Sequence, residues 1–465
     1  MRSREDAYRA IERALDPLGV RREPAACAGH ALGGIVPEAV ALPSSAEQVA
    51  EVLAHAAEAG LSLVPWGGAS GADPGRAPAC GPPARYDLAL SLARLDAILE
   101  HDADNLTLTT QGGARLFDVA HRLRPQRQVL SLGWPSAHHT LGGWVAGHRS
   151  SPKRLVYGAV RDQLLGVRLA LSGSPTADGR GLLVRFGGKV LKNVAGYDIS
   201  KLVIGSLGTA GVIVETTWKL FALPDEEAYW GGAFPTIGHA RRFAAALMGS
   251  PLLPACIFLL DAAAAARFAL LEGFPWQPGP ALAWVGFDGR ALATRRQIAD
   301  ASALAAREQG TVMVPRDRTG DAAAAYLMGE GDPKAALQVR AGVPPSLLSD
   351  LHAELIAGLT AALEGAPGEA RSAAAPVESV MDYPAGRITL RVEAPPARAA
   401  ALAAWIRASR QALARHQGFL VIERAPTPMR HDAGTFGEMG AQRLMRAVQA
   451  QFDPQRVLTP ERLLS

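Results

Sequence analysis

Four short segments of this 465-residue chain combine glycines with hydroxyl, imidazole or basic side chains, which are residue types that hold anions and flat ligands. The first is the loop Pro65-Trp-Gly-Gly-Ala-Ser-Gly71, which follows the apolar run Leu61–Val64. Because glycines allow positive φ angles, the loop can present consecutive backbone N–H groups to an anion, and Ser70 adds a hydroxyl donor. A purely structural turn explains this segment equally well.

The second segment, residues 134–151, holds three histidines, three glycines and several hydroxyls. Glycines let the backbone approach a flat ligand closely. Imidazole exchanges protons near neutral pH, so His138 and His139 are candidate catalytic groups. Arg149 is a third candidate, because a cation there would stabilise negative charge on a ligand. Simple exposure of the loop to solvent is the competing interpretation.

Two further segments, FGGKVLKNVAGYD at 186–198 and IGSLGTAGVIVE at 204–215, are also rich in glycine. The glycines of the last segment fit no phosphate-binding fingerprint, and the Walker A pattern is absent. The glycine loop at 65–71 continues into the proline-rich stretch 74–83, which cannot form the helix that a Rossmann or P-loop unit requires. We therefore exclude these common nucleotide-binding units.

The elements around these segments predict a β-α-β unit followed by an antiparallel sheet. Ser44 with Glu47 forms a capping box before an amphipathic helix, Gly60 ends this helix, and a buried strand follows. The helix pattern at 116–123 interrupts short strand patterns. These strand patterns lie at 106–110, 167–171, 182–186 and 212–220.

We expect four regions along the chain. They are an N-terminal helical segment (1–34), a mixed α/β domain (35–224), a second α+β domain (228–430) and a C-terminal helix with an extended end (440–465). In the second domain, Ala-rich helices alternate with strand patterns at 257–260, 283–287, 387–392 and 419–423.

The composition, 48% hydrophobic and 20% charged, is that of a folded soluble protein. The formal net charge of +4 is too small to favour nucleic-acid binding, but ten basic and four acidic residues lie between Lys153 and Lys219. This local excess suits either an anionic cofactor or a basic docking face. The three widely spaced cysteines provide neither a disulfide framework nor the ligands of an iron–sulfur cluster, and no signal peptide or long apolar run is present.

Together and in this order, the four segments resemble the FAD-binding domain of the vanillyl-alcohol oxidase/PCMH-type flavoproteins, and most of all the FAD-binding subunit of bacterial glycolate oxidases. The stretch GGKVLKNVAGYDISKLVIGSLGTAGVI is the most specific part, and the resemblance returns at FDPQRVLTPERLL, residues 452–464. It implies an α+β fold: a PCMH-type FAD-binding domain of two α/β subdomains at 35–224, an α+β cap domain at 228–430, and a C-terminal segment that returns to the FAD domain.

The resemblance also implies which residues contact FAD. Residues 65–71 correspond to the pyrophosphate loop, residues 134–140 and 147–150 to the segments around the isoalloxazine and ribityl chain, and residues 207–213 to a segment beside the flavin pyrimidine and the adenosine. The predicted cofactor-binding residues are Pro65, Trp66, Gly67, Gly68, Ala69, Ser70, Gly71, Trp134, Pro135, Ser136, Ala137, His138, His139, Thr140, Gly142, Gly143, Gly147, His148, Arg149, Ser150, Leu207, Gly208, Thr209, Ala210, Gly211, Val212 and Ile213.

Three departures from the family pattern carry predictions. Many members have a histidine in the pyrophosphate loop that binds the flavin covalently, whereas Ala69-Ser70 stands here, so we expect noncovalent FAD. Thr459-Pro460 replaces the usual Asn-Pro, which implies one weaker polar contact. The metal-binding pattern H-x-G-D-G-N-x-H of relatives that oxidise 2-hydroxy acids unaided is missing from residues 228–440, so we expect no metal site.

The resemblance implies oxidation of a 2-hydroxy acid such as glycolate to the 2-oxo acid, by hydride transfer to flavin. The implied partners are a larger FAD-linked catalytic subunit and an iron–sulfur subunit that receives the electrons. We expect a cytoplasmic protein without a nucleic-acid partner, and membrane association only through its partner subunits. Two alternatives stay open: a self-sufficient FAD-dependent dehydrogenase of another alcohol or hydroxy acid, and a flavin-free scaffold subunit.

Overall fold

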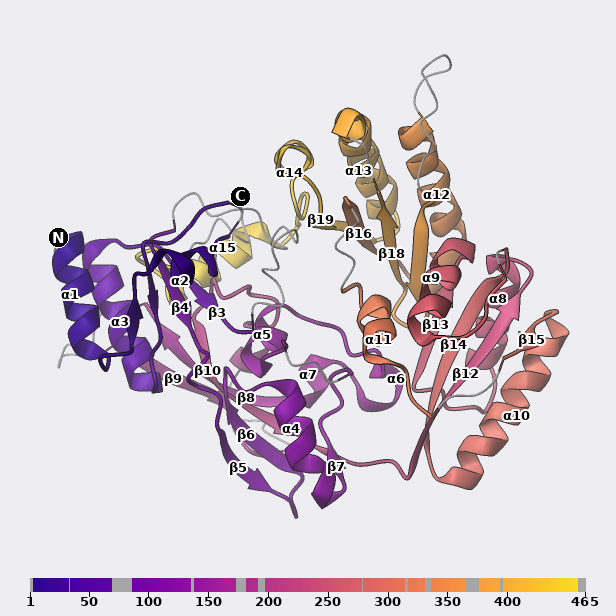
Figure 1. Cartoon of the computed structure of the whole chain (residues 1–465), viewed down its shortest axis with the longest axis horizontal. Helices are drawn as coiled ribbons and strands as arrows, with labels where there is room; N and C mark the ends of the chain where they lie inside the picture. Colours follow the sequence, from indigo (N-terminus) through magenta and orange to yellow (C-terminus); the bar gives the residue numbers. More distant parts are fainter. Residues whose placement is uncertain are drawn as a thin grey trace. The chain divides into compact units, whose positions relative to one another are not determined.

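A computed structural model of the chain describes residues 3–32, 34–68, 86–134, 138–172, 181–190, 197–277, 279–313, 317–330, 336–364, 376–393 and 396–458. The chain divides into two compact units (Figure 1). The first contains Met1–Ser151, Gly158–Leu223 and Glu438–Ser465, and the second contains Pro152–Tyr157 and Pro224–Gly437. The α+β prediction is confirmed, since each unit combines helices with sheets.

The first unit contains two main sheets and several helices. Its helices are α1 (Arg4–Ala14), α2 (Pro24–Ala28), α3 (Ala46–Ala59), α4 (Leu116–Leu123), η1 (Arg124–Gln126), α5 (Leu141–Ala146), α7 (Val160–Gln163), η2 (Ile199–Lys201) and α15 (Gln442–Phe452). Its strands are β1 (Val20–Arg21), β2 (Ala39–Ala41), β3 (Leu63–Trp66), β4 (Leu88–Ser91), β5 (Ile98–Asp102), β6 (Thr107–Gln111), β7 (Gln128–Val129), β8 (Leu164–Leu171), β9 (Leu182–Gly187), β10 (Val212–Lys219) and β11 (Phe221–Ala222).

The predicted β-α-β unit is formed by β2, α3 and β3, with β4 inserted between the two strands in the order β1-β2-β4-β3. Both β2 and β3 run parallel to β4. The predicted cap is wrong by one position, because Ser45, not Ser44, is the N-cap and accepts from the N–H of Gln48 at 3.1 Å. The predicted end is confirmed: Gly60 adopts a left-handed conformation with φ of 63°.

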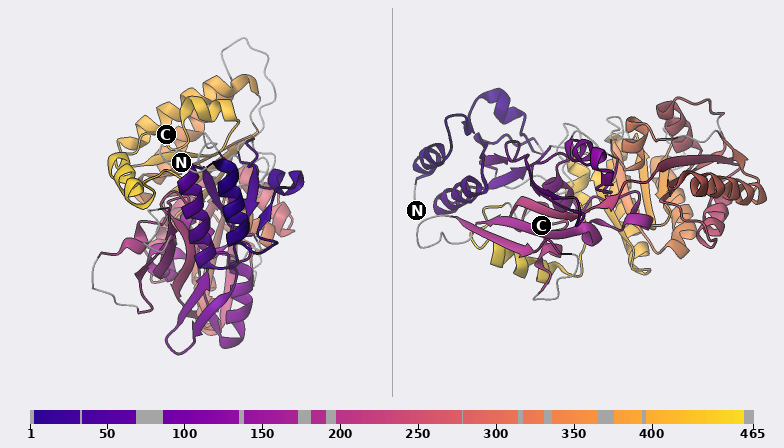
Figure 2. Two further views of the ribbon diagram at one scale, coloured as in Figure 1. Left: turned by 90° about the vertical axis from the view of Figure 1, so that its left-hand side faces the viewer. Right: turned by 90° about the horizontal axis from the view of Figure 1, so that it is seen from below.

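The second sheet of this unit is antiparallel, as predicted, in the order β5-β6-β10-β8-β9. Helix α3 packs on β8, β9 and β10. Helix α1 lies beside α3 in both figures, and Ala7 and Ile11 on α1 are fully buried in the core that α3 forms with the strands (Figures 1 and 2). The N-terminal segment is thus part of the first unit rather than a region of its own.

The second unit is built on one large antiparallel sheet. Its helices are α6 (Arg154–Tyr157), α8 (Ile237–Met248), α9 (Ala262–Glu272), α10 (Ala291–Arg307), α11 (Asp321–Leu327), η3 (Pro345–Leu347), α12 (Leu348–Glu364), η4 (Pro396–Arg398), α13 (Ala399–Ala414) and α14 (Thr427–Ala433). Its strands are β12 (Glu226–Phe234), β13 (Cys256–Leu260), β14 (Ala281–Gly289), β15 (Thr311–Val312), β16 (Leu337–Gly342), β17 (Glu378–Asp382), β18 (Arg387–Val392) and β19 (Phe419–Arg424).

The strand order of this sheet is β15-β12-β14-β13-β17-β18-β16-β19. One face carries the hydrophobic core, which it shares with α8, α10, α12 and α13. On α12, Leu351, Leu355 and Leu359 face this core at helical spacing. The helical stretch Pro345–Glu364 is long and apolar enough to cross a membrane by length and composition alone, and its apolar stripe is explained by the core.

The assignment of Pro152–Tyr157 to the second unit corrects a sequence expectation. We expected Lys153 and Arg154 to belong to the cofactor domain together with the basic residues that follow them. In the structure, Lys153 forms ion pairs with Asp288 and Glu227 of the second unit, at 2.9 and 2.8 Å. The local positive charge is therefore shared between two units.

Candidate functional site

Two of the predicted ligand-binding segments meet where β3 ends and α5 begins, inside the first unit. Gly67 and Gly68 follow β3, and a Cβ atom on Gly68 would overlap the carbonyl oxygen of His138. A Cβ atom on Gly67 would overlap the hydroxyl oxygen of Thr140. Both positions therefore require glycine, because two segments far apart in sequence approach each other here.

The backbone at Gly67 and Gly68 also offers donors. Neither N–H group donates a hydrogen bond to a residue in the described ranges. Adjacent N–H groups of this kind form an anion-binding concavity. The anion-binding interpretation of this loop is therefore supported as far as residue 68, while Ala69, Ser70 and Gly71 lie outside the described residues.

The loop before β10 is the third segment at this place. The N–H groups of Gly205 and Leu207 donate to carbonyl oxygens in the last turn of α5, at 3.0 and 2.9 Å. Leu207 and Gly208 both have positive φ angles, 56° and 77°, and a Cβ atom on Gly208 would lie 3.2 Å from Pro65. Residues 205–208 thus contact both the end of α5 and the end of β3.

The glycines of α5 have a structural explanation of their own. The hydroxyl of Thr140 caps the helix by accepting from the N–H of Gly143 at 3.2 Å. Gly142 donates to the carbonyl oxygen of Gly112 at 2.8 Å, and a Cβ atom on Gly142 would lie 2.8 Å from this oxygen. Packing of α5 on the end of β6 is sufficient reason for Gly142, and its contact with a ligand stays a prediction.

The candidate catalytic residues occupy different environments. His139 is 2% exposed, and its ring packs edge-on against Trp144 with centroids 5.1 Å apart. His138 and His148 are exposed, and Arg149 is partly buried. Of the three candidates for catalysis, His138 and Arg149 are accessible to a ligand, whereas His139 is an interior residue.

Several predicted contact residues are core residues. Thr209 is fully buried and donates its hydroxyl proton to the carbonyl oxygen of Ser206 at 2.7 Å. The Trp66 side chain is buried, and its indole N–H donates to the Tyr86 hydroxyl at 2.6 Å. Buried apolar positions of the last segment are Ala210, Val212 and Ile213. Pro135, Ser136 and Ala137 lie outside the described residues.

Sequence reasoning missed two polar groups at this place. The indole N–H of Trp144 on α5 and the hydroxyl of Ser206 are buried, and neither has a hydrogen-bond partner in the described part of the chain. Buried polar atoms of this kind are costly unless a bound group satisfies them. Both lie in segments that meet at the end of α5, so they fit a site that holds a polar ligand.

Several basic residues of the first unit form ion pairs with acids. Arg168 and Arg185 both bind Glu215, at 2.7 and 2.6 Å, and Lys189 binds Glu100. Lys201 lies 3.6 Å from Asp198. These pairs neutralise part of the positive excess that suits either an anionic cofactor or a basic docking face. The backbone N–H groups are therefore the better-supported anion contacts.

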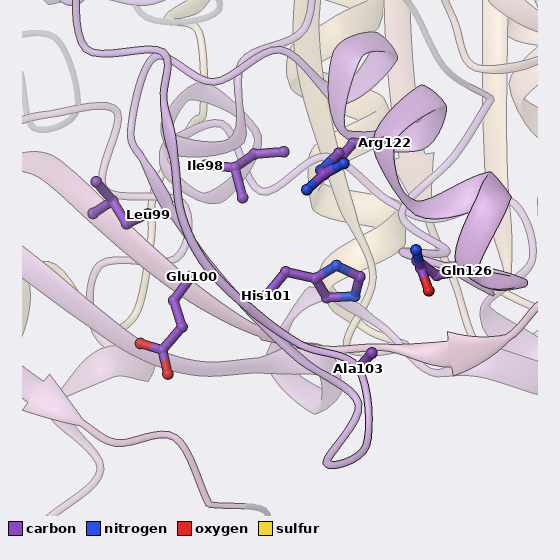
Figure 3. Close-up of a pocket in the computed structure, with 7 residues that line it drawn as sticks. All are labelled: Ile98, Leu99, Glu100, His101, Ala103, Arg122 and Gln126. Atoms are coloured by element: carbon purple, nitrogen blue, oxygen red, sulfur yellow. The ribbon is translucent and has the colours of Figure 1, made fainter.

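A pocket of about 450 Å³ lies elsewhere in the first unit (Figure 3). Its walls come from β5 and the turn after it, and from the end of α4 with the following η1 turn. The ring of His101 points toward Arg122 and Gln126, and its Nε2 lies 2.7 Å from Gln128. No residue of this pocket belongs to the predicted ligand-binding segments. In the described residues, no group of three or more His, Cys, Asp or Glu is placed to hold a metal ion.

Comparison with known proteins identifies FAD as the cofactor of this chain. Residues 37–176 match the family model described as "FAD binding domain". The chain is 29% identical over 233 residues to the glycolate oxidase subunit GlcD of Bacillus subtilis (strain 168), covering 49% of this chain and 46% of that protein. It is 37% identical over 129 residues to the glycolate oxidase subunit GlcE of Escherichia coli (strain K12), covering 27% and 35%.

These matches cover only part of each curated relative. The chain spans about half the length, or less, of the curated relatives that it matches. Among solved structures, p-cresol methylhydroxylase with substrate bound has a TM-score of 0.68 at 13% identity, covering 98% of this chain and 96% of that one. At this identity the likeness concerns the fold alone, and it confirms the expected PCMH-type fold.

The described residues fit FAD. A diphosphate needs adjacent donors, which Gly67 and Gly68 supply, and a flat ring system needs close backbone approach, which the 205–208 loop and α5 provide. The buried donors of Trp144 and Ser206 are available to a polar ligand edge. The prediction of FAD as cofactor is confirmed by the family match; noncovalent binding stays a prediction.

Proposed function

We propose that this chain, which contains an FAD-binding domain of the PCMH-type fold, is the FAD-binding subunit of a glycolate-oxidase-type complex. The complex would oxidise a small 2-hydroxy acid such as glycolate to the 2-oxo acid. A larger FAD-linked subunit and an iron–sulfur subunit would be its partners, and the iron–sulfur subunit would carry the electrons away. Similarity to proteins named as glycolate oxidase subunits supports this proposal.

One structural observation carries the flavin part of the proposal. The described parts of three predicted segments meet at one place in the first unit, at Gly68, at His138 and at Leu207. Bound FAD would supply the hydride acceptor of the reaction. The protein would bind the diphosphate through backbone N–H groups and hold the ring system between α5 and the 205–208 loop.

The remaining chemistry is proton transfer and charge stabilisation. Oxidation of a 2-hydroxy acid releases a hydride from the carbinol carbon and a proton from its hydroxyl. His138 is exposed next to Gly68 and is the proposed acceptor of this proton. Arg149 is the proposed cation beside negative charge that develops on the cofactor.

The test is anaerobic reduction of the bound flavin. The full chain is purified alone and with the co-expressed partner subunits, and absorbance near 450 nm is followed while glycolate or D-lactate is added. Flavin that bleaches only in the complex would support the proposal. Bleaching of the flavin in the isolated chain would contradict the proposal and indicate a self-sufficient dehydrogenase. Failure of the chain to bind added FAD would indicate a scaffold subunit.

A further inference from the structure

The direction of the Gly67 N–H group is set by the peptide bond that joins this residue to Trp66. Trp66 is the last residue of β3, and its carbonyl oxygen accepts from the N–H of Leu92, which directly follows β4, at 2.8 Å. Because this peptide bond is trans, the N–H of Gly67 points opposite to that carbonyl and away from β4. The strand order β1-β2-β4-β3 places β3 at the edge of its sheet. The N–H group is therefore directed toward the side of β3 that carries no strand of this sheet.

The side chain of Trp66 provides a second attachment for the same peptide. Its indole N–H donates to the Tyr86 hydroxyl at 2.6 Å, and this hydroxyl donates to the carbonyl oxygen of His30 at 3.0 Å. A tyrosine hydroxyl has one proton to donate and an oxygen that accepts, so both roles are used here. Trp66 is thus tied through Tyr86 to the turn that follows α2.

His30 is itself held in place in this turn. Its backbone N–H donates to the carbonyl oxygen of Cys27 at 3.0 Å, and its ring Nδ1 lies 2.8 Å from the carbonyl oxygen of Ala26. Since a carbonyl oxygen only accepts, Nδ1 carries the proton. The ring packs edge-on against Trp66, with the ring centroids 5.0 Å apart. His30 therefore supports Trp66 both through its ring and through Tyr86.

Apolar side chains surround these hydrogen bonds. The Trp66 and Tyr86 side chains are 5% and 4% exposed, and the buried residues packed with them are Cys27, Leu32, Val40, Val64 and Ala89. Loss of the Tyr86 hydroxyl would leave the indole N–H without its acceptor in this interior, which is costly. The match to the FAD-binding family begins at residue 37, so α2 and the turn after it support the loop from outside the matched region.

We propose that Tyr86 is a positioning residue for FAD. Its hydroxyl holds Trp66 against the turn after α2, and so fixes the backbone that presents the N–H groups of Gly67 and Gly68 to the diphosphate. Donors that are fixed before the ligand arrives bind it at a smaller entropic cost. The inference rests on the flavin part of the proposed function, and not on which substrate is oxidised.

The test compares FAD binding by Tyr86→Phe, Tyr8→Phe and wild type, each as the full chain. Phenylalanine keeps the ring and removes the hydroxyl. Tyr8 on α1 is the matched control, because it is also 4% exposed and its hydroxyl donates to Glu38, at 3.0 Å, rather than binding Trp66. Fluorescence titration of the apo chain measures the dissociation constant of FAD. We expect Tyr86→Phe to weaken FAD binding by about fivefold, and Tyr8→Phe to leave it unchanged.

Phosphorus NMR of the bound FAD separates positioning from a general loss of stability. The chemical shifts of the diphosphate depend on the hydrogen bonds that it accepts, so they should change in Tyr86→Phe and stay at the wild-type values in Tyr8→Phe. If Tyr86→Phe does not fold, Trp66→Phe removes the same hydrogen bond from its other end and should give the same loss of affinity and the same change in chemical shifts.

Two results would overturn the inference: equal FAD affinity in Tyr86→Phe and Tyr8→Phe, or wild-type phosphorus chemical shifts in Tyr86→Phe. The proposed reaction is judged separately, because no substrate is added in these measurements. FAD binding that depends on Tyr86, without reduction of the flavin by glycolate in any complex, would reject the proposed reaction and keep the positioning role.

Discussion

The carbonyl oxygen of His138 lies against the α-carbon of Gly68, so closely that a Cβ atom at position 68 would overlap it. This contact joins the loop after β3 to the segment before α5. The N–H groups of Gly67 and Gly68 donate to no acceptor in the described ranges, while the neighbouring Thr140 caps α5. The proposed diphosphate site and the proposed ring site are therefore one packed structure, and a change in one should alter the other.

Gly68→Ala is expected to lower FAD affinity by about tenfold or more. The added methyl group must push the backbone at His138 away, and overpacking of this kind costs about 1–3 kcal/mol. A cost of about 1.4 kcal/mol in the binding free energy corresponds to a tenfold change in affinity. Fluorescence titration of the apo full chain with FAD measures the dissociation constant. Gly440→Ala is the control, because a Cβ atom there meets nothing within 4 Å. Equal affinities in the two variants would contradict this prediction.

Local patterns were sufficient for several elements. The helix expected at 116–123 is α4 with the same bounds, because its apolar residues recur at helical spacing. Gly60 ends α3 as expected, since glycine adopts positive φ at little cost. The sequence does not predict the strand β5, because Ile98–Asp102 shows no alternation of apolar and polar residues. Ser44 and Ser45 offer equivalent caps, and sequence alone chose the wrong one.

Relationships between distant residues were beyond the sequence. The excess of basic residues between Lys153 and Lys219 can be counted from the sequence. The pairing of Arg168 with Glu215 depends on the register of β8 against β10, which cannot be derived from composition. Lys153 contacts Asp288 only because the short segment Pro152–Tyr157 is part of the second unit.

Lys153→Met is expected to destabilise the protein by about 3–5 kcal/mol, because it leaves the buried carboxylate of Asp288 without its cation. The loss should be largest at high pH. Burial already raises the pKa of Asp288 and the Lys153 charge opposes this, so in the variant the pKa rises further. As the pH falls, protonation of Asp288 removes the unpaired charge and part of the loss. Urea unfolding at pH 8 and pH 5 measures both effects.

The control for Lys153 is Arg242→Met. Arg242 binds Glu308 at 2.7 Å, but its side chain is 50% exposed. Solvent screens such pairs, and we expect a loss of no more than about 1 kcal/mol with little dependence on pH over this range. If Lys153→Met behaves like this control, the ion pair does not anchor α6.

Asp453→Ala is expected to destabilise the protein by about 2–3 kcal/mol and to weaken FAD binding. The two carboxylate oxygens accept from the N–H groups of Val457 and Leu458, at 2.9 and 2.8 Å. Val457 in turn accepts from Leu63 at 2.7 Å, so the C-terminal segment supports β3, which leads to the glycine loop. Chemical denaturation and FAD titration measure the two effects. The control is Asp300→Ala, which removes an exposed ion pair with Arg296 on α10. It should change neither the stability nor the FAD affinity.

Proton binding by His352 should contribute to unfolding in acid. The side chain is 8% exposed, and its Nε2 lies 2.8 Å from the Ser379 hydroxyl. Burial lowers its pKa to about 4, compared with about 6.5 in the unfolded chain. Because the unfolded state binds the proton first, this residue costs stability as the pH falls from about 6.5 toward 4, by on the order of 3 kcal/mol in total.

His352→Gln removes this proton-linked cost while keeping a side chain that can hydrogen-bond to Ser379. Urea unfolding of wild type and variant between pH 7 and pH 4.5 should show that the variant loses about 2–3 kcal/mol less over this interval. His416→Gln is the matched control, because His416 is exposed and the same substitution there should leave the pH dependence unchanged. Parallel stability curves for wild type and His352→Gln would show that His352 is protonated as easily in the folded protein as in the unfolded chain.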